Sequence, residues 1–215
     1  MSPKYELIYF ELRGYGEMIR LLFADQGKEL TEVRYSYENK DEWNKVKETF
    51  AFGQIPCLVE DGKRIVQFGA IMRHLGRVFN LKGDSECDET YADMFFEGLR
   101  DAHKNWAMFV YGNFTNPEAQ ALFFGSTLPT TVGQLEKLFA TRENGKEFVL
   151  GKKLSYVDYY LFELMDVFLT MDAKALDQTP LLKAFHERFG QRSNLKEYLA
   201  KRAAAGVKIS GSGHM

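Results

Sequence analysis

Residues 5–10 read YELIYF, an apolar and β-rich run that is typical of a buried strand. After two glycines, Gly14 and Gly16, residues 17–26 read EMIRLLFADQ and place their apolar residues on one face of a helix. Residues 29–35 then alternate between apolar and polar types, as a second strand does. The order strand, helix, strand predicts a βαβ unit at the start of the chain.

The chain continues with a pattern that completes a small mixed sheet. The dipeptide Asp61-Gly62 is flanked by two short β-rich runs and favours a tight hairpin turn between them. The predicted elements are a helix over 41–49, strands over 57–60 and 63–67, and a helix over 70–79. The order βαβ followed by ββα predicts an α+β domain with a thioredoxin-like sheet over residues 1–80.

Helical patterns replace strand patterns after a short linker, residues 82–85. The predicted helices cover residues 86–111, 117–141, 155–170, 180–191 and 194–204. We therefore expect an all-α, helical C-terminal domain over residues 81–215. Ser155 and Asp158 are spaced as a helix capping box and indicate a folding motif without catalytic content. The linker-like end, residues 210–215, is by itself compatible with a natural flexible end and with a cloning remnant.

The charge and cysteine content exclude several classes of function. The 215 residues include 28 Lys and Arg against 30 Asp and Glu, so the chain lacks the basic excess of a nucleic-acid-binding surface. The two cysteines and four histidines predict neither a metal site nor a disulfide framework, and favour a reducing, cytoplasmic compartment. We find no signal peptide and no apolar run long enough to span a membrane. An aromatic content of 14% suits a cavity for planar, apolar ligands as well as a core.

Two local features indicate chemistry from the residues alone. Tyr9 lies at the end of the first predicted strand, where a phenol can donate a hydrogen bond to a thiolate, although a strand tyrosine is also an ordinary packing residue. The Ile55-Pro56 bond precedes a predicted strand and is a candidate cis peptide, with an ordinary trans bond as the alternative. A cis bond would leave the backbone of Ile55 exposed to an extended peptide ligand.

Several motifs together resemble the cytosolic glutathione transferases, in particular the pi class of invertebrates. In the first part of the chain the motifs are Tyr9-Phe10, Arg13-Gly14, FGQIP at 52–56, Gln67 with GAI at 69–71, and RHLGR at 73–77. In the second part they are DMF at 93–95, GLRD at 98–101, GKKLSYVDY at 151–159, FHER at 185–188 and LKEYLAKR at 195–202. The resemblance covers essentially the whole chain. It implies an enzyme with glutathione as co-substrate and no further cofactor, and it favours a natural C-terminal tail.

The resemblance assigns a catalytic role to Tyr9, whose phenolic proton would stabilise the glutathione thiolate. The implied glutathione-binding residues are Tyr9, Tyr15, Trp43, Lys47, Gln54, Ile55, Pro56, Gln67, Phe68 and Asp101. Within this set the resemblance implies that Trp43, Lys47 and Gln54 would hold the glycyl end and that Ile55 would pair with the cysteinyl backbone. The γ-glutamyl end would be bound by Gln67 and, from the neighbouring subunit, by Asp101. Taken singly, these residues are also compatible with surface or packing roles.

The resemblance also implies an electrophile site and a dimer. The electrophile site would be lined by Phe10, Leu12, Tyr15, Trp106, Ala107, Val110, Tyr111 and Ser210. Trp106 and Tyr111 are equally compatible with packing between helices. Phe52 corresponds to an aromatic anchor that enters the partner subunit, which predicts a homodimer.

Two positions depart from the family pattern. Phe68 stands where the family has a serine whose hydroxyl binds the γ-glutamyl carboxylate, and Tyr15 stands where the pi class often has an arginine. Losing a hydrogen bond to a charged group costs roughly 1.5–3 kcal/mol, while the backbone amides and the helix dipole remain. We therefore expect glutathione binding to be weakened.

Three functions are compatible with these residues. The first is conjugation of glutathione to small hydrophobic electrophiles, with Tyr9 as the thiolate stabiliser. The second is a non-catalytic, ligandin-type carrier of haem-like or steroid-like molecules, which Phe68 favours. The third is glutathione-dependent prostaglandin isomerisation, which no residue selects.

Overall fold

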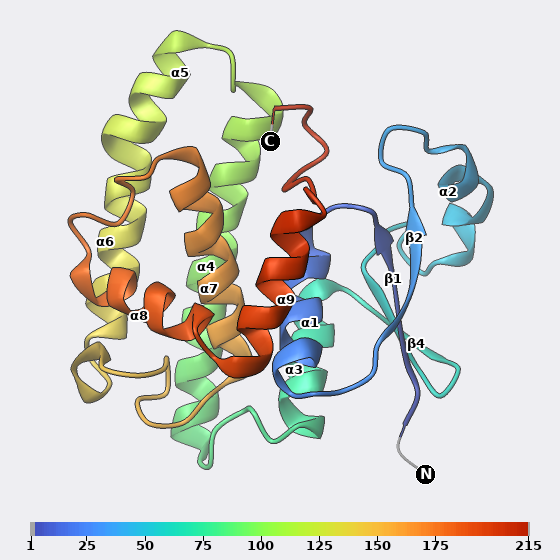
Figure 1. Ribbon diagram of the computed structural model, residues 1–215, viewed down its shortest axis with the longest axis horizontal. Helices are drawn as coiled ribbons and strands as arrows, with labels where there is room; N and C mark the ends of the chain where they lie inside the picture. The colour runs from blue at the N-terminus through green and yellow to red at the C-terminus, as the bar shows by residue number, and fades with distance from the viewer. Residues whose placement is uncertain (1–2, 215) are drawn as a thin grey trace. The chain divides into compact units, whose positions relative to one another are not determined.

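A four-stranded mixed β-sheet organises the first part of the computed structural model, which describes residues 3–214 (Figure 1). Its strands are β1 (Tyr5–Phe10), β2 (Thr31–Tyr35), β3 (Cys57–Glu60) and β4 (Lys63–Val66). They lie in the order β2-β1-β3-β4, with β1 and β2 parallel and the other neighbours antiparallel. The predicted thioredoxin-like arrangement, βαβ followed by ββα, is confirmed.

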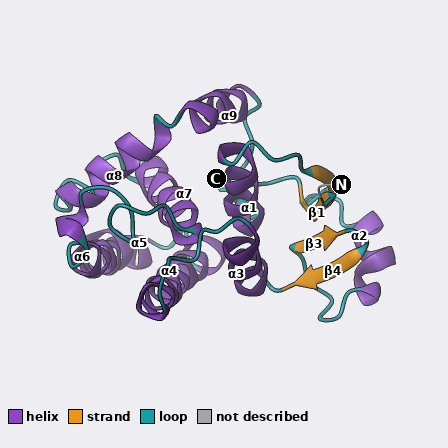
Figure 2. Ribbon diagram, turned by 90° about the horizontal axis from the view of Figure 1, so that it is seen from below, coloured by secondary structure: helices purple, strands orange, loops and turns teal. Residues whose placement is uncertain are grey.

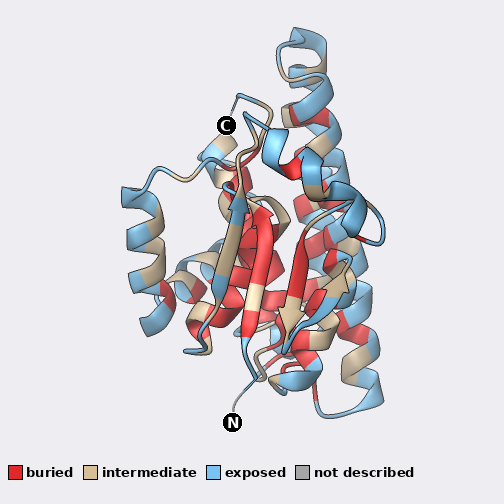
Figure 3. Cartoon of the chain, turned by 90° about the vertical axis from the view of Figure 1, so that its right-hand side faces the viewer, coloured by how far each residue is buried: buried red, intermediate tan, exposed pale blue. Residues whose placement is uncertain are grey.

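Helices cover both faces of this sheet. α1 (Gly14–Asp25) and α3 (Phe68–Val78) lie on one face, and α2 (Asp41–Val46) lies on the other (Figure 2). Trp43 of α2 belongs to a buried cluster that also contains Ile8, Phe50 and Cys57. Figure 3 shows β1 and β3 largely buried, whereas the edge strands β2 and β4 are more exposed. Packing of helices on the sheet therefore covers the central strand β1, in which every residue is buried or half-buried.

The helices of the sheet domain differ in detail from the predicted ranges. α1 begins at Gly14 rather than Glu17, and α3 begins at Phe68 rather than Ala70. Glycines near both starts lower helix propensity, so the sequence pattern places the starts too late. In the first turn the amides have no intrahelical acceptor in any case, and packing on the sheet decides where the helix begins. The helix predicted over 41–49 is α2 followed by a 3-10 turn, η1 (Lys47–Thr49).

The turn between β3 and β4 has the conformation expected for its sequence. Asp61 and Gly62 both have positive φ angles, 46° and 82°. A two-residue hairpin turn of type I′ requires positive φ at both positions, which aspartate and glycine tolerate. Glu60 and Lys63 are paired across the turn, so the predicted hairpin is confirmed.

The second part of the chain is helical, as predicted. Its elements are α4 (Glu86–Gly112), α5 (Pro117–Leu122), the π-helical turn η2 (Phe123–Thr127), α6 (Leu128–Phe139), the 3-10 turn η3 (Glu143–Gly145), α7 (Tyr156–Met171) and α8 (Pro180–Gly190). α7 is buried along most of its length and packs against α4 and α8. In the described part of the chain, no helix is long and apolar enough to cross a membrane.

The single helix predicted over 117–141 is interrupted. The π-helical turn η2 separates α5 from α6, and Pro129 follows in the first turn of α6. Proline has no N–H to donate to the carbonyl four residues earlier, and its ring crowds that carbonyl, so a continuous α-helix is disfavoured here. The sequence pattern of apolar residues continues through this point and does not report the break.

The start of α7 shows the predicted capping box. The Asp158 carboxylate accepts hydrogen bonds from the backbone N–H and the hydroxyl of Ser155, both at 2.7 Å, and from the backbone N–H of Val149, also at 2.7 Å. Ser155 and Asp158 are both fully buried. The carboxylate therefore ties the loop before α7 to the helix, which is a structural role.

The last helix, α9 (Ser193–Ala204), packs beside α1 (Figure 1). The Arg192 guanidinium forms an ion pair with the Asp25 carboxylate at 2.9 Å, and the Asn194 side chain donates to the Asp25 carbonyl at 2.9 Å. Contacts therefore group the described chain into an N-terminal unit, residues up to Phe79 together with Arg192–Gly213, and a helical unit, Asn80–Gln191. The predicted domain boundary between residues 80 and 81 stays a prediction.

Candidate functional site

Tyr9 lies next to the end of β1, and the start of α1 is packed directly on its ring. The Tyr9 side chain is 7% exposed, and its hydroxyl oxygen accepts a hydrogen bond from the backbone N–H of Tyr15 at 3.0 Å. A Cβ atom at Gly14 would lie 2.6 Å from the Tyr9 Oη, and one at Gly16 would lie 2.4 Å from its Cδ1. The two glycines are thus what allows the helix to approach the phenol so closely.

This arrangement prepares the Tyr9 hydroxyl to donate its proton. A hydroxyl has one proton and two lone pairs, and here one lone pair is taken by the Tyr15 N–H. An N-terminal helix amide also carries the positive end of the helix dipole. An anion placed against the hydroxyl would therefore meet a proton donor backed by a second donor. This is the chemistry required to stabilise a thiolate.

A buried ion network holds the loop that follows Tyr9. The Arg20 guanidinium donates to the carbonyls of Leu12 at 2.8 Å and Phe10 at 3.3 Å, and pairs with the Glu17 carboxylate at 3.3 Å. Glu17 also accepts hydrogen bonds from two residues of α9, Tyr198 and Arg202, each at 3.0 Å. Burial and the nearby Glu17 carboxylate raise the pKa of Tyr198.

The sequence reasoning missed this network. Part of the network could have been predicted, because Glu17 and Arg20 are three residues apart on a predicted helix and their opposite charges therefore lie on one side of it. The partners in α9 gave no sequence signal, because they are distant in the chain.

Residues 54–56, directly before β3, contain the candidate cis peptide and three of the predicted glutathione-binding residues. The Ile55-Pro56 peptide is cis, which was one of the two alternatives left open by the sequence. The Gln54 side chain is exposed, Ile55 is half-buried and Pro56 is buried. The predicted pairing of the Ile55 backbone with a peptide ligand stays a prediction.

The start of α3 combines an unusual backbone with an aromatic contact. Gln67 has a φ of 70°, in the left-handed region that non-glycine residues rarely adopt, and its side chain is exposed. Phe68 is 7% exposed, and its ring is stacked on that of Tyr15 with centroids 4.6 Å apart and an interplanar angle of 26°. The two departures from the family pattern therefore touch each other. The left-handed backbone at Gln67 is strained, and such strain often marks a functional position.

Trp43 and Lys47 have different environments. Trp43 is 6% exposed, and its ring contacts Phe10, Tyr35 and Phe50 at centroid distances of 5.9, 5.5 and 5.2 Å. Lys47 is exposed, and its side chain passes over Gly53, where a Cβ would lie 3.3 Å from the Lys47 Cε. Trp43 has the surroundings of a packing residue, and the predicted contact of both side chains with the glycyl end stays a prediction.

The C-terminal segment lies along the loop between β1 and α1. The N–H groups of Arg13 and Gly14 donate to the carbonyls of Lys208 and Ile209, at 2.8 and 3.1 Å. Ser210 is buried, and a Cβ at Gly211 would lie 1.9 Å from the Tyr37 ring. The chain end is thus held by backbone hydrogen bonds and by close packing.

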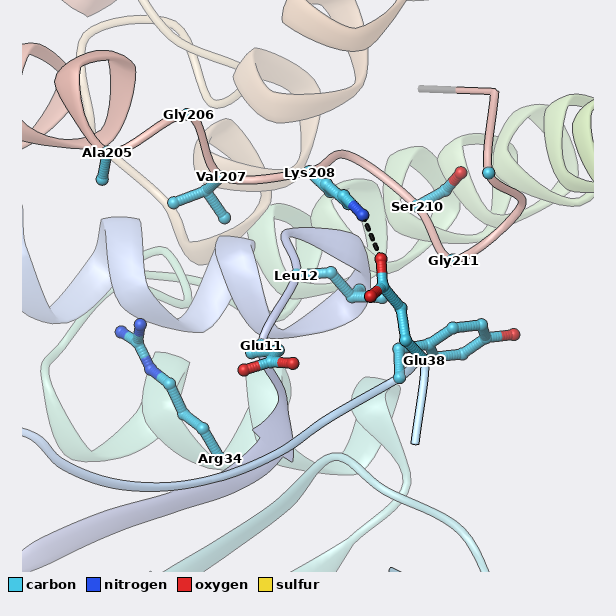
Figure 4. A pocket seen from close by; sticks show the side chains of 12 residues that line it. Glu11, Leu12, Arg34, Glu38, Ala205, Gly206, Val207, Lys208, Ser210 and Gly211 are labelled. Atoms are coloured by element: carbon cyan, nitrogen blue, oxygen red, sulfur yellow. Dashed lines mark hydrogen bonds and ion pairs between the residues drawn. The ribbon is translucent and has the colours of Figure 1, made fainter. Parts of the chain in front are cut away.

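This segment forms one side of a cavity of about 440 Å³ (Figure 4). The cavity is lined by Glu11, Leu12, Arg34, Tyr37, Glu38, Ala205, Gly206, Val207, Lys208, Ser210, Gly211 and Gly213. Lys208 and Glu38 form an ion pair across it. Leu12 and Ser210 belong to the predicted electrophile site, whereas the charged lining residues were missed by the sequence reasoning.

Two other predicted electrophile residues are half-buried, Phe10 at the end of β1 and Tyr15 in the first turn of α1. The other four lie on α4 in the helical unit. Trp106 and Val110 are buried, Ala107 is half-buried and Tyr111 is exposed. The Trp106 indole N–H donates to the Met171 sulfur at 3.1 Å, which is the interhelical packing left open as an alternative. An electrophile-binding role for these residues stays a prediction.

Two residues with predicted intersubunit roles are exposed. Phe52, in the loop before β3, is 63% exposed, and Asp101 on α4 is exposed as well.

Among residues 3–214, no group of three or more His, Cys, Asp or Glu side chains is arranged to hold a metal ion.

Comparisons with known proteins agree along the whole chain. Residues 5–77 match the family model described as "Glutathione S-transferase, N-terminal domain", and residues 100–202 match "Glutathione S-transferase, C-terminal domain". The chain is 44% identical over 209 residues to a glutathione S-transferase of Dirofilaria immitis, covering 97% of this chain and 98% of the relative. It is 45% identical over 209 residues to glutathione S-transferase 2 of Onchocerca volvulus, with the same coverage. The solved structure of the Onchocerca volvulus pi-class enzyme superposes with a TM-score of 0.94 at 44% identity, covering 99% of this chain and 100% of that one.

Proposed function

This chain belongs to the glutathione S-transferase family and is similar to the nematode pi-class enzymes, and we propose that it conjugates the glutathione thiolate to small hydrophobic electrophiles. In that reaction a sulfur–carbon bond forms, the leaving group departs from the electrophile with its electron pair, and the thiol proton is released to solvent. Such a reaction serves detoxification, and its natural place is the cytoplasm.

The observation that carries the proposal is the Tyr9 hydroxyl with the Tyr15 amide behind it. A thiol with a pKa of about 8.5 is mostly protonated at neutral pH, and only the thiolate is a good nucleophile. The Tyr9 hydroxyl would donate to the bound sulfur while its own oxygen accepts from the Tyr15 N–H at 3.0 Å. Each unit by which the pKa of the thiol falls corresponds to about 1.36 kcal/mol.

The family motifs also assign the other residues of the proposed glutathione site. Lys47 and Gln54, with Trp43, would hold the glycyl end, and the backbone of Ile55 beside Pro56 would pair with the cysteinyl residue. Gln67 would contact the γ-glutamyl end. The exposure of Lys47, Gln54 and Gln67 supports this assignment, because ligand-binding polar groups must be reachable.

We also propose a homodimer with two composite sites. The 63% exposed Phe52 would anchor in the partner, and the exposed Asp101 would reach the glutathione bound by the other subunit. Sedimentation at micromolar concentration should give a mass near twice that of one chain, and a monomer would contradict the proposal.

Glutathione binding should be weaker than a serine at position 68 would allow. Phe68 offers no hydroxyl to the γ-glutamyl carboxylate, and one hydrogen bond to a charged group is worth roughly 1.5–3 kcal/mol. Phe68→Ser should therefore tighten glutathione about tenfold or more in a calorimetric titration. Equal affinities would mean that the γ-glutamyl end is held elsewhere.

Activity of the Tyr9→Phe variant tests the proposed function. With a chlorodinitrobenzene-type electrophile, we expect conjugation to fall about tenfold or more, which corresponds to about 1.4 kcal/mol of transition-state stabilisation. Activity within about threefold of the wild type would contradict the catalytic role of Tyr9.

A non-catalytic carrier of hydrophobic ligands is the second candidate. The stacked rings of Tyr15 and Phe68 and the cavity of about 440 Å³ favour it. In a carrier, Tyr9→Phe would leave ligand affinity unchanged and there would be no conjugation to lose.

A further inference from the structure

The segment Gly14-Tyr15-Gly16 has a single side chain, and that side chain is stacked on Phe68. The ring centroids are 4.6 Å apart and the planes differ by 26°. Tyr15 is the second residue of α1 and Phe68 is the first residue of α3. The contact therefore joins the starts of two helices, and since Phe68 is 7% exposed it belongs to the packed interior.

Tyr15 also supplies the backbone N–H that donates to the Tyr9 hydroxyl at 3.0 Å. This bond takes one lone pair of the Tyr9 hydroxyl oxygen. Hydrogen-bonded groups polarise one another, so an oxygen that accepts a bond makes its own O–H a stronger donor. The strength of the Tyr9 hydroxyl as a donor thus depends on where the Tyr15 amide lies.

The glycines on either side offer no side chain to fix the position of that amide, and Gly14 is held through its backbone N–H, which donates to the Ile209 carbonyl at 3.1 Å. Glycine has more backbone freedom than any other residue, and Gly14 has a φ of +41°. A Cβ at Gly16 would lie 2.4 Å from the Tyr9 ring, so a residue with an anchoring side chain cannot replace it without moving Tyr9. The ring of Tyr15 is the side chain in this tripeptide that can hold the amide in place.

We propose that the Tyr15–Phe68 stack is a positioning contact for the catalytic phenol. Phe68 fixes the ring of Tyr15, and the Tyr15 N–H fixes and polarises the Tyr9 hydroxyl. This inference rests on the proposed function, because it assumes that the hydroxyl acts on the glutathione sulfur. It assigns residue 68 a part in turnover in addition to its effect on binding.

Leucine and ring-keeping variants separate this role from simple packing. Phe68→Leu and Tyr15→Leu remove the stack but keep an apolar side chain, while Phe68→Tyr and Tyr15→Phe change the same positions and keep both rings. We expect each leucine variant to lower kcat by about five- to tenfold, with the glutathione KM changed by less than about twofold. The acid limb of the pH–kcat profile should move to higher pH, because the bound thiol ionises less readily. The ring-keeping variants should lose less of kcat than the leucine variants and should shift the acid limb less. Gly133→Ala in α6, where a Cβ would have nothing within 4 Å, is the control expected to match the wild type.

The combined variants sharpen the test. Tyr15→Leu with Phe68→Leu should cost little more than either change alone, because both remove one contact. Phe68→Ser should bind glutathione more tightly and yet turn over more slowly, since it gains a hydroxyl and loses the stack.

Several results would overturn the inference. It is wrong if the leucine variants keep both the wild-type kcat and the wild-type acid limb, or if they lose only melting temperature and folded yield. Tyr15→Leu, at a half-buried position, decides the matter if Phe68→Leu does not fold. Tyr9→Phe measured alongside separates the two proposals. If Tyr9→Phe is active, the proposed function fails; if it is inactive and both leucine variants are unaffected, only the positioning role fails.

Discussion

Two helix starts in this chain have their amides satisfied in different ways. At α7, the Asp158 carboxylate and Ser155 form a capping box from residues within the same short stretch of sequence. At α1, no side chain among the described residues caps the helix in this way, and the Tyr15 amide donates to the hydroxyl of Tyr9 on a neighbouring strand. A local cap completes a helix by itself, whereas the start of α1 is coupled to a reactive group.

The difference shows where a fold places its chemistry. The start of α7 is closed to solvent, since Ser155 and Asp158 are fully buried and hydrogen-bonded to each other. The α1 start is built from glycines and depends on tertiary contacts with Tyr9, Phe68 and the C-terminal segment. A change at the first should therefore affect stability, and a change at the second should affect catalysis.

The largest effect is expected for Asp158→Ala. At least three hydrogen bonds end on this buried carboxylate, and its removal takes the acceptor from buried donors at Ser155 and Val149. At roughly 1–3 kcal/mol for each buried group left unsatisfied, the free energy of unfolding should fall by about 3 kcal/mol or more. Denaturant unfolding measures it. Lys152→Ala, at an exposed position in the same loop, is the control and should be nearly neutral. A loss below about 1 kcal/mol for Asp158→Ala would show that the cap is not needed.

Gly16→Ala should have the next largest effect, and mainly on activity. The added Cβ would lie 2.4 Å from the Tyr9 Cδ1, so either the phenol or the start of α1 must move. We expect kcat to fall about tenfold or more, with a smaller loss of stability of about 1–3 kcal/mol. Gly133→Ala in α6 is a matched control, because nothing lies within 4 Å of its Cβ position and alanine favours a helix. Equal activity of the two variants would contradict the close fit described for Tyr9.

Ser85→Ala should have the smallest effect. Ser85 is an ordinary N-cap, and its hydroxyl accepts a hydrogen bond from the Asp88 N–H at 3.1 Å at the start of α4. Loss of such a cap costs about 1 kcal/mol. The melting temperature should drop slightly while kcat stays at the wild-type value. A loss of activity without a loss of stability would break the distinction between structural and functional helix starts.

The features that sequence reasoning recovered are those set by nearby residues. The strand at Tyr5–Phe10, the Asp61-Gly62 turn and the Ser155–Asp158 box each depend on a few adjacent positions and could be predicted from local pattern. The break at η2 was missed because apolar periodicity continues through it. The packing of α9 on α1 was missed because it joins residues that are far apart in the chain.

In the candidate site, too, the residues could be predicted from the sequence but their contacts could not. Motif spacing pointed to Tyr9, Gln67 and Phe68 through a resemblance that spans the chain. It gave no sign that Phe68 and Tyr15 are in contact, since a ring stack between two helix starts exists only in the folded protein. It also gave no sign of the Tyr15 amide at the Tyr9 hydroxyl, because backbone donors leave no trace in side-chain identity.

The pKa of the glutathione thiol in the bound complex tests the central claim most directly. It can be followed by the ultraviolet absorbance of the thiolate as pH is raised, in the wild type and in Tyr9→Phe at saturating glutathione. We predict a wild-type value at least about one unit below the free thiol value of about 8.5, and a return to near that value in Tyr9→Phe. The same bound thiol pKa in both proteins would contradict the account, since the Tyr9 hydroxyl would then contribute nothing to the thiolate.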